Sequence, residues 1–105
     1  MPEPIVVIVT FLPKEGARAE LVTALQQSIP EVHTEEGCEL YALHSVPDGS
    51  LFLIEKWTSA VELDAHAAGD IVRRLDGSIE SLLAVPAVVT RIAPLPAGST
   101  GQGQL

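Results

Sequence analysis

Cysteine and basic residues are scarce in this sequence. Cys38 is the only cysteine among the 105 residues, which excludes an internal disulfide and leaves no cysteine spacing typical of a metal site. Lys and Arg number 6 against 14 Asp and Glu, so the formal net charge is −8. Nucleic acids and anionic membranes are bound by clusters of basic side chains, and Arg73–Arg74 is the only basic pair. We therefore expect neither of them as a partner.

Long apolar runs are missing as well. The run Ile5–Leu12 is short, is broken by Thr10 and follows Glu3, which is neither the pattern of a signal peptide nor that of a membrane-spanning helix. The hydrophobic content of 47% suffices for one packed core, so we predict a cytoplasmic globular domain. Phosphate-binding loops, a dinucleotide-binding fingerprint and paired metal ligands are absent from the sequence. We therefore predict no metal and no other cofactor.

Strand-like and helix-like patterns succeed one another in a definite order. They predict strand Ile5–Leu12, a helix from Ala17, strands Cys38–Val46 and Leu51–Thr58 joined by the turn Pro47–Ser50, helices over Ala60–Ala68 and from Asp70, and strand Val85–Ile92. This β-α-β-β-α-β order is typical of the ferredoxin-like α+β fold, with a four-stranded antiparallel sheet and the helices on one face. We expect this domain over residues 1–93. Proline and glycine predict a flexible C-terminal arm over residues 94–105.

Capping residues predict three helix boundaries. Ser59–Glu62 has the spacing of a capping box, in which the serine oxygen accepts a backbone N–H and the glutamate reaches back to the cap. Ser28–Glu31 repeats that spacing beside Pro30, which predicts a kink or a fresh helix start there. Asp70 is expected to cap the last helix.

The strands expected at the centre of the sheet are apolar on both faces. In Ile5–Leu12, odd and even positions alike carry aliphatic or aromatic side chains, apart from Thr10. Two helices cover one face of such a sheet, which leaves the other face in need of a partner. A second copy of the same sheet is the simplest partner, so we expect a homodimer through the sheet face.

One strand-to-helix corner gathers side chains that suit acid–base chemistry. Strand alternation places Glu55 and Trp57 on one face, and helical spacing places Leu63 and His66 on one side of the next helix. We predict His66 as a general base, oriented by Glu55, with Trp57 as a wall on which an aromatic ring stacks. Tyr41, on the neighbouring strand, is expected to bond a substrate oxygen.

Structural roles remain open for the same residues. His66 also suits a half-buried histidine bonded to a backbone carbonyl, and Glu55 suits pairing with a lysine or a backbone donor. Trp57 and Tyr41 also suit the core, the tyrosine with its hydroxyl in water.

Several short segments together resemble the antibiotic biosynthesis monooxygenase family. The resemblance covers roughly residues 4–93 and rests on Glu36–Tyr41, Leu43-His44, Phe52, Glu55–Thr58 and Leu63–His66. It implies a ferredoxin-like domain that pairs face to face as a dimeric α+β barrel, with a cavity between sheet and helices. It further implies oxygenases that oxidise phenols or quinols with molecular oxygen without a metal or prosthetic group, although this fold also supports other functions.

The chain departs from the family at two positions. Many relatives carry a second histidine about five residues after the one that matches His66, where this chain has Ile71. Haem-degrading relatives use an asparagine on the first strand, a tryptophan in place of His66 and a histidine at the position of Asp76. The first strand here is apolar except for Thr10, which argues against haem degradation.

The first hypothesis for function is a cofactor-independent monooxygenase that acts on a small hydroxylated aromatic or a quinol. Two alternatives stay open. One is a non-catalytic dimeric protein that binds a small ligand, which the missing second histidine favours. The other is a cofactor-free isomerase that uses the same base.

Overall fold

A computed structural model describes residues 3–105 of the chain. Its elements, in order, are β1 (Ile5–Phe11), α1 (Arg18–Val32), β2 (Cys38–Ser45), β3 (Leu51–Trp57), α2 (Ala60–Ala67), α3 (Asp70–Ile79), the 3-10 turn η1 (Glu80–Leu82) and β4 (Val88–Ile92). The strands form one antiparallel sheet in the order β2-β3-β1-β4, with β1 and β3 in the middle. The ferredoxin-like α+β fold predicted from the sequence is confirmed.

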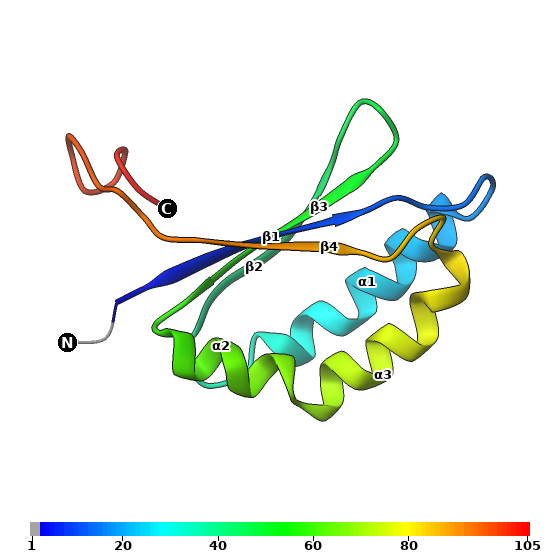
Figure 1. Cartoon of the computed structure of the whole chain (residues 1–105), viewed down its shortest axis with the longest axis horizontal. Coiled ribbons are helices and arrows are strands. Elements are labelled where there is room, and N and C mark those ends of the chain that lie inside the picture. Colours follow the sequence, from blue (N-terminus) through cyan, green and yellow to red (C-terminus); the bar gives the residue numbers. More distant parts are fainter. Residues whose placement is uncertain (1–2) are drawn as a thin grey trace.

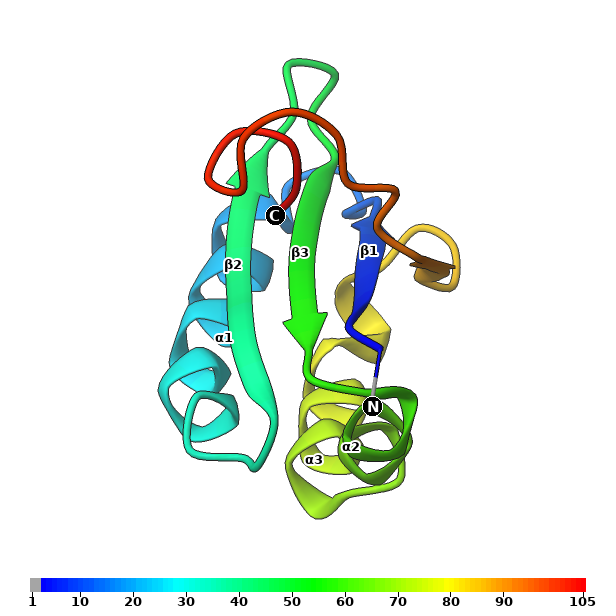
Figure 2. The same cartoon turned by 90° about the vertical axis from the view of Figure 1, so that its left-hand side faces the viewer.

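All three helices lie on the same side of the sheet. Figure 1 shows the sheet nearly edge-on, with α1, α2 and α3 beneath it and no helix above it, where the turn between β2 and β3 and the C-terminal segment rise. Figure 2, turned by 90°, shows α1 on the side of β2, and α2 and α3 below the side of the sheet that holds β3 and β1. The molecule therefore has two layers, and one face of the sheet carries no helix.

The period-2 alternation of the strands decides which side chains meet the helices. In β3, alternate residues are buried, beginning with Leu51 and ending with Trp57. The registers pair Val7 with Glu55 and Glu55 with Tyr41, so these residues share the helix-facing side. This side holds most of the buried core, to which α1 contributes Leu21 and Leu25.

The opposite side, called the open face below, is also apolar. The registers of the four strands place on it Val6 and Ile8 of β1, Leu40 and Ala42 of β2, Phe52 and Ile54 of β3, and Val88 and Ile92 of β4. Val88 is 57% exposed and Ile92 40% exposed, so apolar surface at this face meets solvent in the isolated chain. The two-sided apolar pattern predicted for the central strands is therefore present in the sheet.

The predicted capping boxes do not form. Ser59 does precede α2, but its hydroxyl donates a hydrogen bond to the Glu62 carboxylate and caps no backbone N–H. The Glu62 side chain lies against Gly37, whose positive φ of 83° and missing Cβ let it approach. The Glu62 carboxylate is thus bonded to the Ser59 hydroxyl, and its Cβ and Cγ pack beside Gly37.

The helix starts predicted at Ala60 and Asp70 match the structure, but the other two capping predictions are also wrong. α1 runs without a restart through Pro30, and the Ser28 hydroxyl donates to the carbonyl of Leu25 at 2.8 Å instead of capping a new helix. Because proline has no N–H, α1 lacks the hydrogen bond that residue 30 would donate to the carbonyl of Gln26, and the helix ends two residues later at Val32. Gly69 is the N-cap of α3, while Asp70 is its first residue and pairs with Arg73 at 2.9 Å.

The last strand and the C-terminal segment complete the chain. β4 begins at Val88, three residues later than predicted, and pairs with β1 along the edge of the sheet. The segment after Ile92 contains no helix or strand, and the Lys56 ammonium of the open face donates a hydrogen bond to the backbone oxygen of Leu105. The arm thus returns to its own sheet. Within residues 3–105, the structure contains no helix with the length and apolar character that crossing a membrane requires.

Candidate active site

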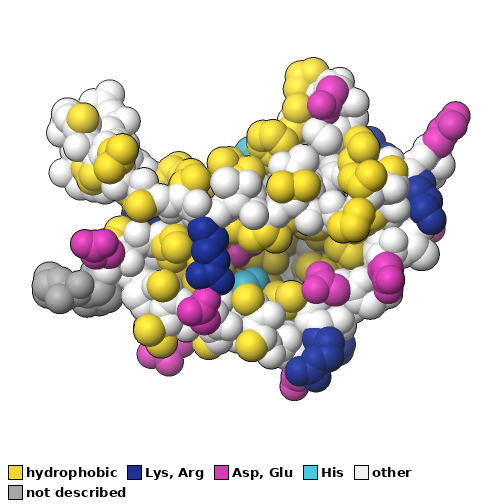
Figure 3. Space-filling model, in the orientation of Figure 1, with side chains coloured by type: hydrophobic (Ala, Val, Ile, Leu, Met, Phe, Trp, Pro, Cys, Tyr) yellow, Lys and Arg dark blue, Asp and Glu magenta, His cyan; other side chains and the backbone are white. Residues whose placement is uncertain are grey.

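A cavity of about 450 Å³ lies between the sheet and the helices. Most of its wall is apolar, from Val7, Val9, Phe11, Leu53, Leu63, Val72, Leu75, Ile79, Leu83, Ala87 and Val89. Its polar lining is contributed by Tyr41, Glu55, His66, Asp76, Glu80 and Arg91. Figure 3 shows the hollow opening on the side of the molecule that faces the viewer, with charged side chains at its border and a histidine inside. A mostly apolar cavity of this size with a few converging polar groups is typical of a small-molecule site.

His66 is held at one end of this cavity by two carboxylates. Its Nδ1 lies 2.9 Å from Oε2 of Glu35, and its Nε2 lies 3.8 Å from Oε1 of Glu55. The residue is only 6% exposed, so it is more deeply buried than the half-buried histidine considered from the sequence. Its partners are carboxylates and not the backbone carbonyl of that interpretation. An imidazole between two carboxylates is well placed to carry a positive charge for part of a reaction.

Glu55 is a buried carboxyl whose bonds differ from those expected. The indole Nε1–H of Trp57 donates to Glu55 Oε1 at 2.9 Å, so an indole takes the place of the predicted lysine or backbone donor. Burial raises the pKa of Glu55, while the indole hydrogen bond and the nearby His66 oppose that rise. Glu55 and His66 are therefore brought together as predicted.

Trp57 takes the core position that the sequence left open for it and does not form the predicted wall for a substrate ring. It is fully buried and does not line the cavity. Its ring centroid lies 4.5 Å from that of His66, which it supports from behind. The indole thus holds Glu55 and His66 in position and presents no face on which a substrate ring could stack. The alternation of β3 is as predicted, since Trp57 is buried on the same side as Glu55. Its ring packs against His66, however, and does not border the cavity.

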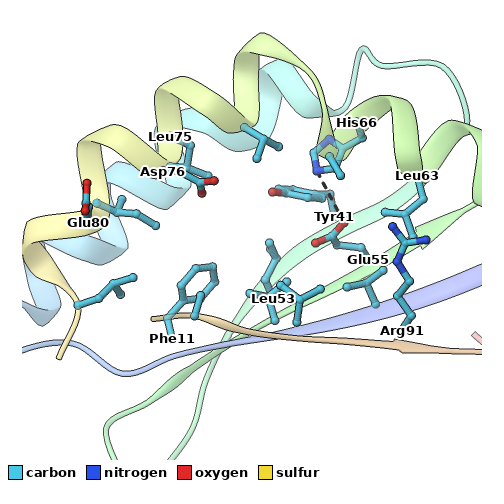
Figure 4. A pocket seen from close by; sticks show the side chains of 18 of the residues that line it. Phe11, Tyr41, Leu53, Glu55, Leu63, His66, Leu75, Asp76, Glu80 and Arg91 are labelled. Atoms are coloured by element: carbon cyan, nitrogen blue, oxygen red, sulfur yellow. Dashed lines mark ion pairs between the residues drawn. The ribbon is translucent and has the colours of Figure 1, made fainter. Parts of the chain in front are cut away.

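Tyr41 and Leu63 both line the cavity. The Tyr41 ring packs edge-on against His66, with centroids 5.4 Å apart, and Figure 4 shows its hydroxyl directed into the cavity. Burial raises the pKa of Tyr41 above its ordinary value, and Glu55 and Glu35 raise it further. Its hydroxyl therefore stays protonated and can donate a hydrogen bond. Leu63 is buried and shares its helix side with His66, as the spacing predicted.

Four charged residues of the site, among them Glu80 of η1, were not found from the sequence. Glu35 precedes β2 in a loop, Asp76 lies on α3 and Arg91 lies on β4. Arg91 bonds Asp64 Oδ1 at 2.7 Å beside the cavity. Their only sequence signal is residue type, since each comes from a segment distant from the corner that holds His66. Burial raises the pKa of Asp76, and the nearby His66 lowers it.

His66 also lines a second hollow on its other side. This hollow is bordered by Glu35, Glu36, Val61, Glu62, Ala65, Gly69, Asp70 and Ile71. The imidazole therefore forms part of the wall between an apolar cavity and an acidic surface hollow. Among residues 3–105, no group of three or more His, Cys, Asp or Glu side chains is arranged to hold a metal ion.

Comparison with known proteins identifies the family. A model of the family described as antibiotic biosynthesis monooxygenase matches residues 4–75. The chain belongs to this family. It is 34% identical to a Mycobacterium tuberculosis protein named "Putative monooxygenase Rv0793" over 94% of this chain and 99% of that protein. The solved structure of Rv0793 superposes with a TM-score of 0.84 over 91% of this chain and 99% of the other.

Other solved structures share the fold. Protein SO0527 of Shewanella oneidensis is 27% identical, with a TM-score of 0.79 over 88% of this chain and 91% of that chain. A structure from Caulobacter crescentus, titled as a putative antibiotic biosynthesis monooxygenase, is 20% identical with a TM-score of 0.82 over 88% and 90% of the two chains. The second likeness shows the fold alone. Membership of the antibiotic biosynthesis monooxygenase family supports a monooxygenase-like function in general terms.

The structure shows where two of the positions lie at which this chain differs from its relatives, Ile71 and Asp76. Ile71, which replaces the second histidine of many relatives, lines the acidic hollow and not the cavity. The replacement of a histidine by Ile71 therefore changes the lining of the acidic hollow and leaves the acid–base groups of the cavity as they are. Asp76 lines the cavity itself, where it contributes a carboxylate.

Proposed function

We propose that the protein is a cofactor-independent monooxygenase that oxidises a small hydroxylated aromatic or a quinol with molecular oxygen. The observation that carries this proposal is the placement of His66 on the wall of an apolar cavity, with its Nδ1 bonded to a carboxylate. Family membership and the relative named as a monooxygenase support the general reaction.

The contact with Glu35 decides which nitrogen acts as the base. A carboxylate accepts a hydrogen bond, so Nδ1 of a neutral His66 carries the proton and donates it to Glu35. Nε2 then has its lone pair available on the side of Glu55 and the cavity. When Nε2 takes the proton of a substrate hydroxyl, the imidazolium lies between two carboxylates that stabilise its charge.

Tyr41 and the apolar wall complete the proposed chemistry. The protonated Tyr41 hydroxyl donates a hydrogen bond to the substrate oxygen that becomes an anion. The resulting phenolate is electron-rich and reduces oxygen directly, while the aliphatic wall excludes water from the reacting ring. Oxygen bonds to a ring carbon that bears hydrogen, and the O–O and C–H bonds then break. One oxygen atom remains as a new ring carbonyl, and the other leaves as water that carries the ring proton and the proton held by His66. The substrate supplies all four electrons, and His66 returns its proton to the departing oxygen.

The test is oxygen uptake by the purified protein with a panel of hydroquinones, naphthols and anthrones, with product analysis for one added oxygen atom. Uptake above the uncatalysed rate, with incorporation of labelled oxygen from the gas, would support the proposal. Ligand-induced thermal stabilisation without uptake would overturn it in favour of a binding protein. Conversion of a ligand without oxygen consumption would overturn it in favour of an isomerase.

We also propose that the active form is a homodimer formed through the open face. Its apolar residues on all four strands, with Val88 and Ile92 exposed, support a partner of the same apolar character. A second copy presents such a face by symmetry, and a stable pair of this kind buries more than roughly 2,000 Å². Analytical ultracentrifugation at micromolar concentration is the test. A stable folded monomer would contradict the proposal.

A further inference from the structure

The charged lining of the cavity is mostly acidic. Among the described residues that line it, Glu55, Asp76 and Glu80 carry carboxyl groups, and Arg91 carries the only guanidinium or ammonium group. Figure 4 shows the Asp76 carboxylate and the Tyr41 hydroxyl both directed into the space, with Arg91 beside Glu55 at the other end. His66, which also gains positive charge when protonated, is bonded to Glu35.

Arg91 is already engaged by acids of the protein. Its guanidinium bonds Asp64 Oδ1 at 2.7 Å, and it lies close enough to Glu55 to lower the pKa of that carboxyl. An anionic substituent of a ligand would have to compete with these two carboxylates for one cation. The arginine therefore neutralises groups of the site and is poorly placed to receive a charge from outside.

The remaining wall makes a buried anion costly. Aliphatic side chains replace the water that a carboxylate needs, and even for Asp76, which is partly exposed at the border of the cavity, loss of water raises the pKa against the opposing effect of His66. A second anion in the same space would add repulsion from Asp76 and Glu80 to its own loss of hydration. A neutral ring with hydroxyl groups meets neither penalty and finds hydrogen-bond partners in Tyr41 and His66.

We infer that the cavity selects uncharged hydroxylated aromatic compounds and rejects those that carry a carboxylate, with Asp76 and Glu80 as the residues that impose the rejection. This inference rests on the proposed function, whose substrate class it narrows. It also assigns the acidic wall a role that the oxidation itself does not require.

The test compares two ligands of equal size and different charge. 6-Hydroxy-2-naphthamide and 6-hydroxy-2-naphthoate share a hydroxylated two-ring system, and only the second is an anion at neutral pH. Titration calorimetry at low ionic strength is expected to show the amide binding at least ~30-fold more tightly, because the acid loses hydration and meets like charges. Equal affinities, tighter binding of the acid, or no binding of either compound would overturn the inference.

Two variants assign the selectivity to its residues. Asp76→Asn and Glu80→Gln are each expected to tighten binding of the acid by roughly 3- to 10-fold and to leave the amide unchanged, because each removes one like charge. Asp70→Asn is the matched control, since Asp70 lies on the same helix but lines the other hollow. Melting curves check that all three variants fold. If the control changes the acid as much as the cavity variants do, the effect is one of net charge and the inference fails.

This experiment separates the inference from the proposed reaction. It measures binding alone, so selectivity for the amide stands even if no compound in the oxygen-uptake panel is turned over. Conversely, an oxygenase that binds the acid as well as the amide keeps the proposed function and loses this substrate class.

Discussion

The two faces of one sheet follow the same alternation but carry different kinds of group. On the face that the helices cover, β2 and β3 carry Tyr41 and Glu55, which are both buried and both have a raised pKa. On the open face, the polar side chains His44 and Lys56 remain in contact with solvent. Burial under a second layer removes water from an acidic group and so raises its pKa. The difference between the faces therefore comes from the helices, which exclude water from one side of the sheet and so raise the pKa of the acidic groups there.

The largest effect is expected from removing the proposed base, His66, from the face that the helices cover. His66→Ala is expected to lower the rate of oxygen uptake by roughly 100- to 10,000-fold, the usual contribution of a positioned acid–base group. Because His66 is buried and bonded to Glu35, the melting temperature should fall as well. Added imidazole should restore part of the rate if the effect is chemical. Full activity in a destabilised variant would end the assignment of His66 as base.

The control for this variant comes from the other face. His44 is exposed and contacts only the carbonyl of Ala42 at 3.1 Å among the hydrogen bonds of the described chain. His44→Ala, assayed at a concentration where sedimentation shows the same oligomeric state as wild type, should therefore leave the rate within a factor of two, because His44 contacts no group of the cavity. An equal loss of rate in both histidine variants would contradict the distinction between the faces.

The second-largest effect is expected on dimerisation, from a change on the open face that leaves the covered face unchanged. Ile54→Lys places two ammonium groups in the proposed apolar interface, one from each copy, and is expected to weaken dimerisation by at least roughly 100-fold. Sedimentation velocity across a concentration series measures it. Val61→Lys is the control, because Val61 is 75% exposed on α2, away from the sheet. An unchanged dimer in Ile54→Lys would place the interface elsewhere.

A smaller effect on kcat is expected from removing the carboxylate that holds His66 on the covered face. Glu35 touches His66 from outside the cavity, so Glu35→Gln should lower kcat by roughly 10- to 100-fold with little change in KM, as with other partners that orient a functional histidine. Nitrogen-detected NMR should show loss of the strict Nδ1–H tautomer. Glu36→Gln is the matched control in the same hollow. A change confined to KM, or an unchanged tautomer, would show that Glu35 does not position the base.

The smallest effect concerns pH and stability. Burial raises the pKa of Glu55 in the folded protein, so the folded state binds this proton more tightly than the unfolded state does. Its contribution to the free energy of unfolding is therefore complete below the ordinary glutamate pKa and is lost as the pH rises through the raised value. Glu55→Gln should lose less stability than wild type over that interval in urea titrations. Parallel pH dependences of the two proteins would contradict the raised pKa.

Much of the fold was determined by the sequence alone, because its signals are local. The period-2 pattern of Leu51–Trp57 placed Glu55 and Trp57 on one face, and the helical spacing of Leu63 and His66 placed both on the cavity side. The family resemblance rested on the same segments. The bonds at the helix ends were predicted wrongly, since the Ser59–Glu62 pair depends on a glycine more than twenty residues away in the chain.

Only the tertiary structure decided the site itself. Glu35 stands 31 residues from His66 in the chain and still supplies its closest carboxylate. Arg91 reaches the cavity because β4 pairs with β1 from the opposite end of the sequence, and Asp76 does so because α3 packs over the sheet. Alternation and helical spacing fix the face of a side chain within its own element, and they carry no information about which distant element approaches that face. For that physical reason the sequence predicted His66 as the base beside Glu55, and only the fold showed that Glu35 and Asp76 also lie near it.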